Sequence, residues 1–168
     1  MRRRLLIFLA MFPLTGCSNA AALDYNNAVS QLDRDLENIK RDFGATLTSL
    51  APTPHPAPRL RAKHDECLVK IVDLGRRFVE LTPPRGSESA ELHDGFGRFL
   101  KSQTTLFREE YGGMVAAFEK KLASDAINKI VQDSLAKIAI EEKQQTESLR
   151  AAQKRFADAH RLKLAATK

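Results

Sequence analysis

Cysteine and histidine, the side chains best suited to binding transition metals and to nucleophilic or acid–base catalysis, are few in this sequence. Of 168 residues, two are cysteine and four are histidine. His64 precedes Cys67 by three positions, so on a helix the two side chains would share a face and could approach one metal ion. Two ligands do not complete a zinc site, and nothing nearby is spaced to complete it. We therefore expect Cys67 to be a buried core thiol, and we expect no bound metal or cofactor. If the chain does bind a metal, His64 and Cys67 are the candidate ligands.

Motifs of known catalytic chemistry are absent from the sequence. It contains no Gly-x-Ser-x-Gly, no His-Glu-x-x-His, no phosphate-binding loop and no Cys-x-x-Cys-His. Glu91 and His93 are two positions apart, whereas di-iron bundles place glutamate and histidine three apart on two helices. His93 and the glycines at 95 and 97 could shape a small pocket, but they fit better as a close helix crossing. The sequence predicts a protein that is not an enzyme.

Cys17 has a different setting, because it closes a segment with the layout of an export signal. Arg2, Arg3 and Arg4 open the chain, and residues 5–14 carry no charge. That apolar run is shorter than the roughly 20 residues that a membrane-spanning helix needs. The segment ends in Leu14-Thr15-Gly16-Cys17, which is an aliphatic residue, a hydroxyl residue, a glycine and a cysteine.

This arrangement resembles the precursors of bacterial lipoproteins, whose lipobox matches at all four positions. The resemblance implies that residues 1–16 are a signal peptide, that the Cys17 thiol is alkylated with diacylglycerol, and that a type II signal peptidase cuts between Gly16 and Cys17. The new amino group is then open to acylation, for example with palmitate. Each buried CH₂ contributes about 0.8 kcal/mol, so two or three chains hold a protein on a bilayer. The alternative is an ordinary secretory signal cut near residues 20–22, with Cys17 in the discarded piece.

The resemblance also implies a location in the bacterial cell envelope. Ser18 follows the cysteine, and a residue other than aspartate there is typical of an outer-membrane destination if the host is Gram-negative. Residues 1–16 hold three arginines and no acidic side chain, so their removal lowers the net charge from +6 to +3. Nucleic-acid binding then loses its main support. The expected partners are the membrane, through the lipid anchor, and either another protein or a second copy of the chain.

Two proline clusters organise the rest of the chain, at residues 52–58 and 83–84. Between and after them, apolar residues recur every three or four positions, which is the period of a helix and not of a strand. We predict helices at about 23–50, 59–82, 88–122 and 125–164, after a short tether at residues 17–22. These predict one all-α domain over residues 23–168, an antiparallel four-helix bundle with coiled-coil-like packing and a long C-terminal helix.

Details of the last two helices lead to further predictions. The apolar phase continues across Gly112-Gly113, which indicates a kink rather than a turn. The last predicted helix would be roughly 60 Å long against roughly 42 Å for the first, so it should overhang the bundle or bend. Its apolar seam becomes polar at Glu142 and Gln145, which predicts a segment that faces solvent or another copy.

The last nineteen residues are strongly basic, with six cationic side chains against Asp158. Cations are favoured at a helix C-terminus by the helix dipole, and this is the plainer interpretation. The other is an end that contacts anionic surfaces such as phospholipid headgroups. The candidate contact residues are Arg150, Lys154, Arg155, Arg161 and Lys163.

These observations together predict a cell-envelope lipoprotein, anchored through acylated Cys17, whose helical bundle acts as a structural or protein-interaction module. One alternative is a ligand- or metal-binding bundle that faces the periplasm, with its pocket near His64, Cys67 or His93. Another is a membrane-apposing module that uses the basic C-terminal helix.

Overall fold

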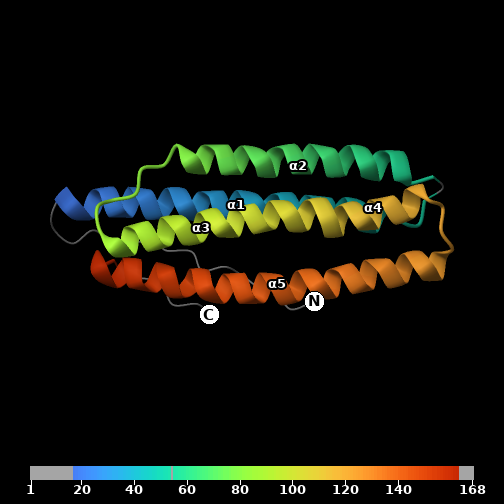
Figure 1. The fold of residues 1–168 in the computed structure, drawn as a ribbon. Coiled ribbons are helices and arrows are strands. Elements are labelled where there is room, and N and C mark those ends of the chain that lie inside the picture. The colour runs from blue at the N-terminus through green and yellow to red at the C-terminus, as the bar shows by residue number, and fades with distance from the viewer. Residues whose placement is uncertain (1–16, 54, 163–168) are drawn as a thin grey trace.

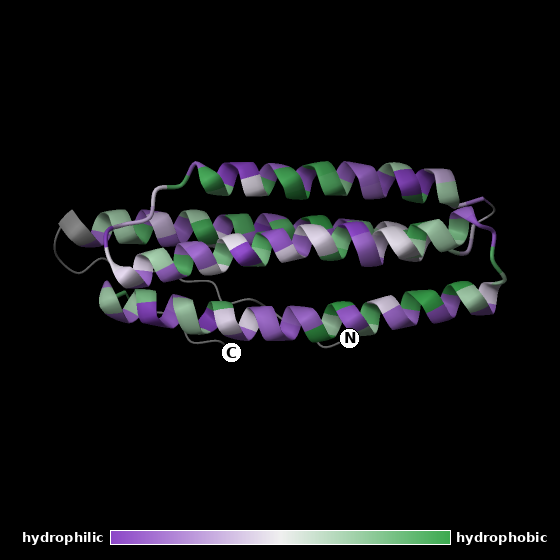
Figure 2. Cartoon of the chain, in the orientation of Figure 1, coloured by the Kyte–Doolittle hydropathy of each residue, from purple (hydrophilic) through white to green (hydrophobic). Residues whose placement is uncertain are grey.

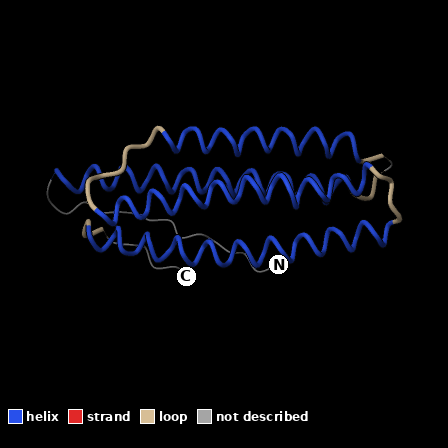
Figure 3. The backbone as a smooth tube through the Cα atoms, in the orientation of Figure 1, coloured by secondary structure: helices blue, strands red, loops and turns tan. Residues whose placement is uncertain are grey.

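The computed structural model describes residues 17–53 and 55–162, and these form four long helical rods (Figure 1). The first, second and fourth rods are single helices, and the third continues through three segments. The bounds are α1 Cys17–Leu50, α2 Ala57–Val79, α3 Ser87–Leu106, η1 Phe107–Tyr111, α4 Gly112–Glu119 and α5 Ser124–Ala159. Figure 3 shows helix and loop but no strand in this described part. The predicted all-α four-helix bundle, with antiparallel neighbours and a long C-terminal helix, is confirmed.

The prolines separate the first three rods. Proline lacks a backbone N–H and is tolerated only in the first turn of a helix. Accordingly Pro56 lies at the N-cap of α2 and Pro58 at its second position. At the other end of α2, the helix stops at Val79, before the pair Pro83-Pro84. The turn between α4 and α5 contains no proline.

Apolar side chains from all four rods meet in one main core. Phe43 of α1, Phe96 of α3, Phe107 of η1 and Phe156 of α5 are all fully buried. In Figure 2 the hydrophobic residues form stripes along the rods, with hydrophilic residues between them. Burying each such ring contributes on the order of 1.5–3 kcal/mol, so the core stabilises the bundle along most of its length.

Two helix ends differ from the predicted ones. α1 begins at Cys17 and not at Leu23, so residues 17–22 are helical rather than a loose tether. Alanine favours a helix, and no proline or glycine interrupts the run Ala20-Ala21-Ala22, of which Ala22 is buried. α5 ends at Ala159, five residues before its predicted end. With 34 and 36 residues the two helices are both just over 50 Å long, so the predicted length difference, from which an overhang or a bend was expected, is wrong.

The third rod passes through Gly112-Gly113 without a turn, as expected. The irregularity lies just before them, where Phe107–Tyr111 form one π-helical turn. The wider turn brings Phe107 and Tyr111 into a stack with ring centroids 4.7 Å apart. Both rings then contact Phe43 edge-on, at 5.3 and 5.4 Å between centroids. The π-helical turn therefore places two aromatic rings on one residue of α1.

The antiparallel order gives the bundle two distinct ends. At the Cys17 end, α1 starts, α5 finishes and the α2–α3 connector crosses (Figure 1, left). At the Pro56 end, the α1–α2 connector lies beside the turn between α4 and α5 (Figure 1, right). None of the helices described is long and apolar enough to cross a bilayer.

Two glycines inside the third rod should respond differently to alanine. A Cβ at Gly113 would meet nothing within 4 Å, whereas one at Gly97 would lie 3.2 Å from a ring carbon of Phe78. We predict that Gly113→Ala raises the free energy of unfolding by about 1 kcal/mol, the difference in helix propensity. Gly97→Ala should gain clearly less or lose stability, because the buried Phe78 ring must shift. Urea denaturation of both variants measures this, and equal gains would contradict the close α2–α3 approach.

Candidate functional site

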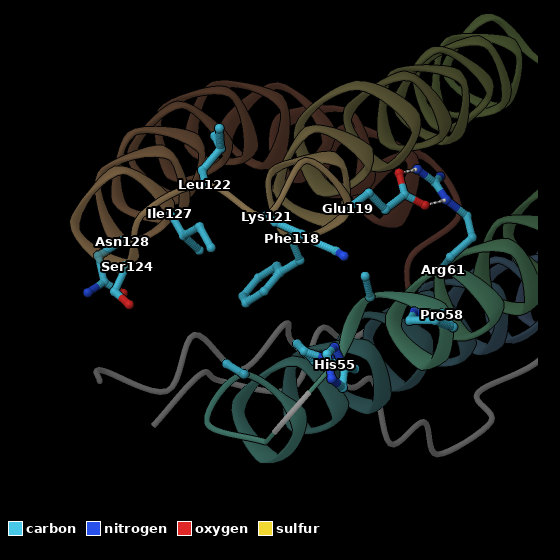
Figure 4. Close-up of a pocket in the computed structure, with 13 residues that line it drawn as sticks. His55, Pro58, Arg61, Phe118, Glu119, Lys121, Leu122, Ser124, Ile127 and Asn128 are labelled. Carbon is cyan, nitrogen blue, oxygen red and sulfur yellow. Dashed lines mark hydrogen bonds and ion pairs between the residues drawn. The ribbon is translucent and has the colours of Figure 1, made fainter.

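A cleft opens at the Pro56 end of the bundle, where four helix termini meet. Its walls come from the α1–α2 connector, the start of α2, the end of α4, the turn that follows it and the start of α5 (Figure 4). The volume is about 730 Å³. Small-molecule sites in proteins occupy roughly 300–1,000 Å³, so the cleft has the size of a ligand site.

One wall of the cleft is apolar. Phe118 and Leu122 come from the end of the third rod and the turn that follows, and Ile127 comes from the first turn of α5. Figure 4 shows the Phe118 ring and the Ile127 side chain projecting into the open space. Leu122 is 37 % exposed, which is high for a leucine beside a core. A ligand in the cleft would cover apolar surface that now faces water.

Charged side chains lie beside this apolar wall. Arg61 of α2 donates from Nε to Oε1 of Glu119 at 2.8 Å and from Nη2 to Oε2 at 2.7 Å. This bidentate pair joins α2 to α4 and lowers the Glu119 pKa, first through the hydrogen bonds to Arg61. Lys121 points into the cleft beside it (Figure 4). Among the described residues, no carboxylate lies within ion-pair distance of Lys121.

The backbone at the cleft is held in an uncommon conformation at two points. His55 has φ 54° and Lys121 has φ 51°, both in the left-handed region that favours glycine. For other residues this region costs on the order of 1 kcal/mol. Lys121 ends α4 at the position where a helix usually has glycine. A lysine therefore stands where the backbone alone would favour glycine.

A second polar group lies in the middle of the bundle. Lys40 of α1, only 12 % exposed, pairs with Glu37 and with Glu142 of α5, each at 2.6 Å. Its Nζ also donates to Oε1 of Gln103 on α3, at 3.4 Å. Burial alone would lower the Lys40 pKa, but the two carboxylates raise it to about 12, so Lys40 stays charged.

Gln145 extends this polar layer. Gln103 donates to its Oε1 at 3.1 Å, and Gln145 in turn donates to the Ser102 hydroxyl. Glu142 and Gln145 therefore face α1 and α3 inside the bundle. The prediction that they form a solvent- or copy-facing segment is wrong, because both side chains form hydrogen bonds with other helices of the same bundle. The sequence could not show this, since the partners lie more than forty positions away in the chain.

Asp33 lies one turn before Glu37 on α1 and is 7 % exposed. Its Oδ1 has no hydrogen-bond partner among the described residues. Desolvation raises the Asp33 pKa to about 7, with a smaller contribution from the negative charge of Glu37. Asp33 is therefore a carboxyl group that changes charge near neutral pH.

His64 and Cys67, the candidate metal ligands, both lie in the core, at 3 % and 0 % exposure. The His64 Nε2 is 3.1 Å from the carbonyl oxygen of Phe107, and its ring stacks on the Phe107 ring. A Cβ at Gly112 would be 3.4 Å from the same nitrogen, so glycine permits this approach. Burial raises the pKa of the Cys67 thiol. Within the described residues, no group of three or more histidine, cysteine or acidic side chains could hold a metal.

His93 is part of the packing between helices. Its Nδ1 is 3.0 Å from the Tyr25 hydroxyl, and its ring stacks on Phe78 at 4.5 Å between centroids. The nearby Gly97 lies against Phe78, which agrees with the predicted close helix crossing. None of the three residues named for a pocket lines the cleft at the Pro56 end.

Three of the predicted basic contact residues, Arg150, Lys154 and Arg155, lie in the last turns of α5, at the Cys17 end of the bundle, and Arg161 follows them. Arg155 forms a bidentate pair with Glu91, and Lys154 pairs with Asp158 at 2.7 Å. Arg150 and Arg161 are exposed, and Lys163 lies outside the described residues. Two of the five cations are therefore already neutralised by carboxylates. Gly16 also lies outside the described residues, while Cys17 opens α1.

Little in the sequence predicted the cleft. His55 lies in the proline-rich connector and Lys121 in a turn 66 positions later, and neither belongs to a motif. Only the topology predicted that these two residues would be neighbours. In an antiparallel four-helix bundle the first and the third connector lie at the same end. No family model, curated protein or solved structure matches this chain.

Asp33 should make stability depend on pH. Its pKa is about 7 in the folded chain against 3.8 for an ordinary aspartate, so the folded state holds the proton more tightly. The stabilisation is complete below about pH 4 and is lost as the pH rises to about 7. We predict that Asp33→Asn unfolds with similar free energy near pH 4 but is more stable than the wild type at pH 8, by a few kcal/mol at about 1.4 kcal/mol per pKa unit.

Urea titrations of both proteins at a series of pH values measure this difference. Asp35→Asn, at a partly exposed position on the same helix, is the matched control and should show no such trend. A difference between wild type and Asp33→Asn that stays constant from pH 4 to pH 8 would contradict the buried setting of Asp33.

Proposed function

We propose that this protein is a bacterial cell-envelope lipoprotein, anchored by acylated Cys17, whose helical bundle serves as a protein-interaction module. The observation that carries the proposal is Leu14-Thr15-Gly16-Cys17, placed directly after three arginines and an uncharged apolar run. The rest of the chain contributes a rigid body with an exposed apolar face, but no catalytic motif.

The geometry of α1 suits such an anchor. α1 begins at Cys17, and Ala22, five residues later, is already buried against the bundle. An acyl chain on Cys17 would thus hold the Cys17 end of the bundle close to the bilayer. The Pro56 end would then lie about 50 Å further along the helix axis, at the rise of 1.5 Å per residue.

An exposed row of valines on α2 supports the interaction role. Val69, Val72 and Val79 are 68, 52 and 78 % exposed, and their spacings of three and seven place them on one helix face. Beside the row is a hollow of about 500 Å³ between α1 and α2, bordered by the ion pair between Arg77 and Asp35. Exposed apolar surface rimmed by charges is typical of a protein-binding face.

The anchor is tested by replacing its cysteine. We predict that the wild type incorporates an alkyne analogue of palmitate in bacterial cells and that Cys17→Ala abolishes this labelling, because no other thiol is in a lipobox. The matched control is Cys67→Ala, which removes the buried core thiol and should keep the label. Fractionation should find wild type and Cys67→Ala with membranes. Undiminished labelling of Cys17→Ala would refute the anchor.

The interaction face is tested by crosslinking in cells. We predict that a photoreactive amino acid at Val72 captures one dominant partner, because this side chain would be covered in the complex. The same residue at Lys143, an exposed polar position on α5, is the control and should give little product. A product of twice the chain's mass identifies a second copy, and any other mass another protein. Identical patterns at the two positions would exclude the valine face.

A further inference from the structure

We propose that the cleft at the Pro56 end binds a long-chain carboxylate, with the apolar chain against Phe118, Leu122 and Ile127 and the carboxylate on Lys121. The site is independent of the anchor, because every residue in it lies at the opposite end of the bundle from Cys17. A chain that is not acylated would keep it. The residues that would bind the ligand do not include His64, Cys67 or His93.

The apolar wall determines the body of the ligand. Phe118 and Ile127 are partly buried and Leu122 is exposed, so all three have apolar surface left to cover. Covering apolar surface contributes about 25 cal/mol per Å². An alkyl chain is the ligand body that gains from this wall without needing hydrogen bonds. A sugar or a nucleotide would leave polar groups unpaired there.

The charge balance determines the head of the ligand. Of the residues that line the cleft, Arg61 and Lys121 are cationic and Glu119 is anionic. Arg61 and Glu119 neutralise one another through two hydrogen bonds, which leaves the positive charge of Lys121. A ligand with one negative charge would neutralise Lys121. A carboxylate can accept hydrogen bonds from Lys121 and from the first backbone N–H groups of α5, whose N-cap Ala123 provides no side-chain cap.

Two of the polar residues that line the cleft have an uncommon backbone conformation. His55 and Lys121 both have positive φ, at 54° and 51°, and they face the cleft from opposite connectors. Lys121 follows the end of α4 as Arg161, also with φ 51°, follows the end of α5, so at both places this conformation ends a helix. Glycine would relieve the backbone cost at Lys121 but would remove the ammonium group, which this proposal assigns to the ligand.

Photoaffinity labelling tests the site on the full chain, in whichever cell fraction contains it. The probe is dodecanoic acid with a diazirine in its chain, and mass spectrometry locates the label. We expect saturable labelling at residues 118–127. Unlabelled dodecanoate should compete about tenfold better than dodecanol, which has the same chain without the charge, since a hydrogen bond to a charged group contributes about 1.5–3 kcal/mol.

Variants at neighbouring lysines separate the role of Lys121 from a general effect of charge. Lys121→Gln should weaken labelling about tenfold. Lys121→Arg should retain it, and so should Lys120→Gln, which removes the adjacent exposed lysine outside the cleft. Circular dichroism of each variant checks that the bundle has folded. Labelling of the cleft does not require Cys17. A negative result in the palmitate experiment would therefore refute the anchor without affecting the test of the cleft.

Several outcomes would overturn the proposal. Label mapped to the valine row of α2, or labelling of Lys121→Gln equal to that of the wild type, would show that Lys121 does not hold the ligand. Equal competition by dodecanol would show that the head-group charge plays no part. If a peptide with apolar C-terminal residues competed more strongly than dodecanoate, the ligand of the cleft would be the C-terminus of a protein and not a long-chain carboxylate.

Discussion

The ammonium group of Lys40 lies among three helices, and the alignment of those helices depends on it. Removing such a group from water is costly, and here Glu37, Glu142 and Gln103 replace the lost hydration. Sliding α5 by one turn, about 5.4 Å, would take Glu142 out of reach and leave Lys40 with only the carboxylate of Glu37, on its own helix. An apolar core alone is less selective, because leucine and phenylalanine pack in several registers. The polar layer therefore selects one register of α5 on α1.

The same register determines what meets at the two ends. With α1 and α5 aligned over almost their full length, the α1–α2 connector and the α4–α5 turn lie side by side and enclose a cleft. The Arg61–Glu119 pair holds α2 and α4 together at its wall. At the other end, Arg155 and Glu91 connect α5 to α3 in a similar manner. Polar contacts at both ends and in the middle of the bundle thus determine how the helices align, while the apolar core between them provides most of the buried surface.

The sequence predicted the architecture because helix period and proline position are local properties. Pro56, Pro58 and the pair at 83–84 mark connectors whatever the tertiary structure, and the seam from Tyr25 to Leu50 has helical spacing by itself. It could not show whether Glu142 faces water or Lys40, since the two are 102 positions apart. The positive φ of Lys121 was equally hidden, because nothing in the residue type indicates it. Predicting the cleft would have required both the long-range contacts between helices and the backbone conformation of its residues.

The π-helical turn at Phe107–Tyr111 has a consequence for how this protein could evolve. One such turn is equivalent to a single residue inserted into a regular helix, and each residue advances a helix by about 100°. Deleting one residue there would return the segment to a regular α-helix and leave Met114 and Val115, both fully buried, facing the core. What would change is the turn itself, which places Phe107 and Tyr111 against Phe43. Homologous chains that are one residue shorter in this segment should therefore keep the phase of the third rod and differ in the aromatic cluster around Phe43.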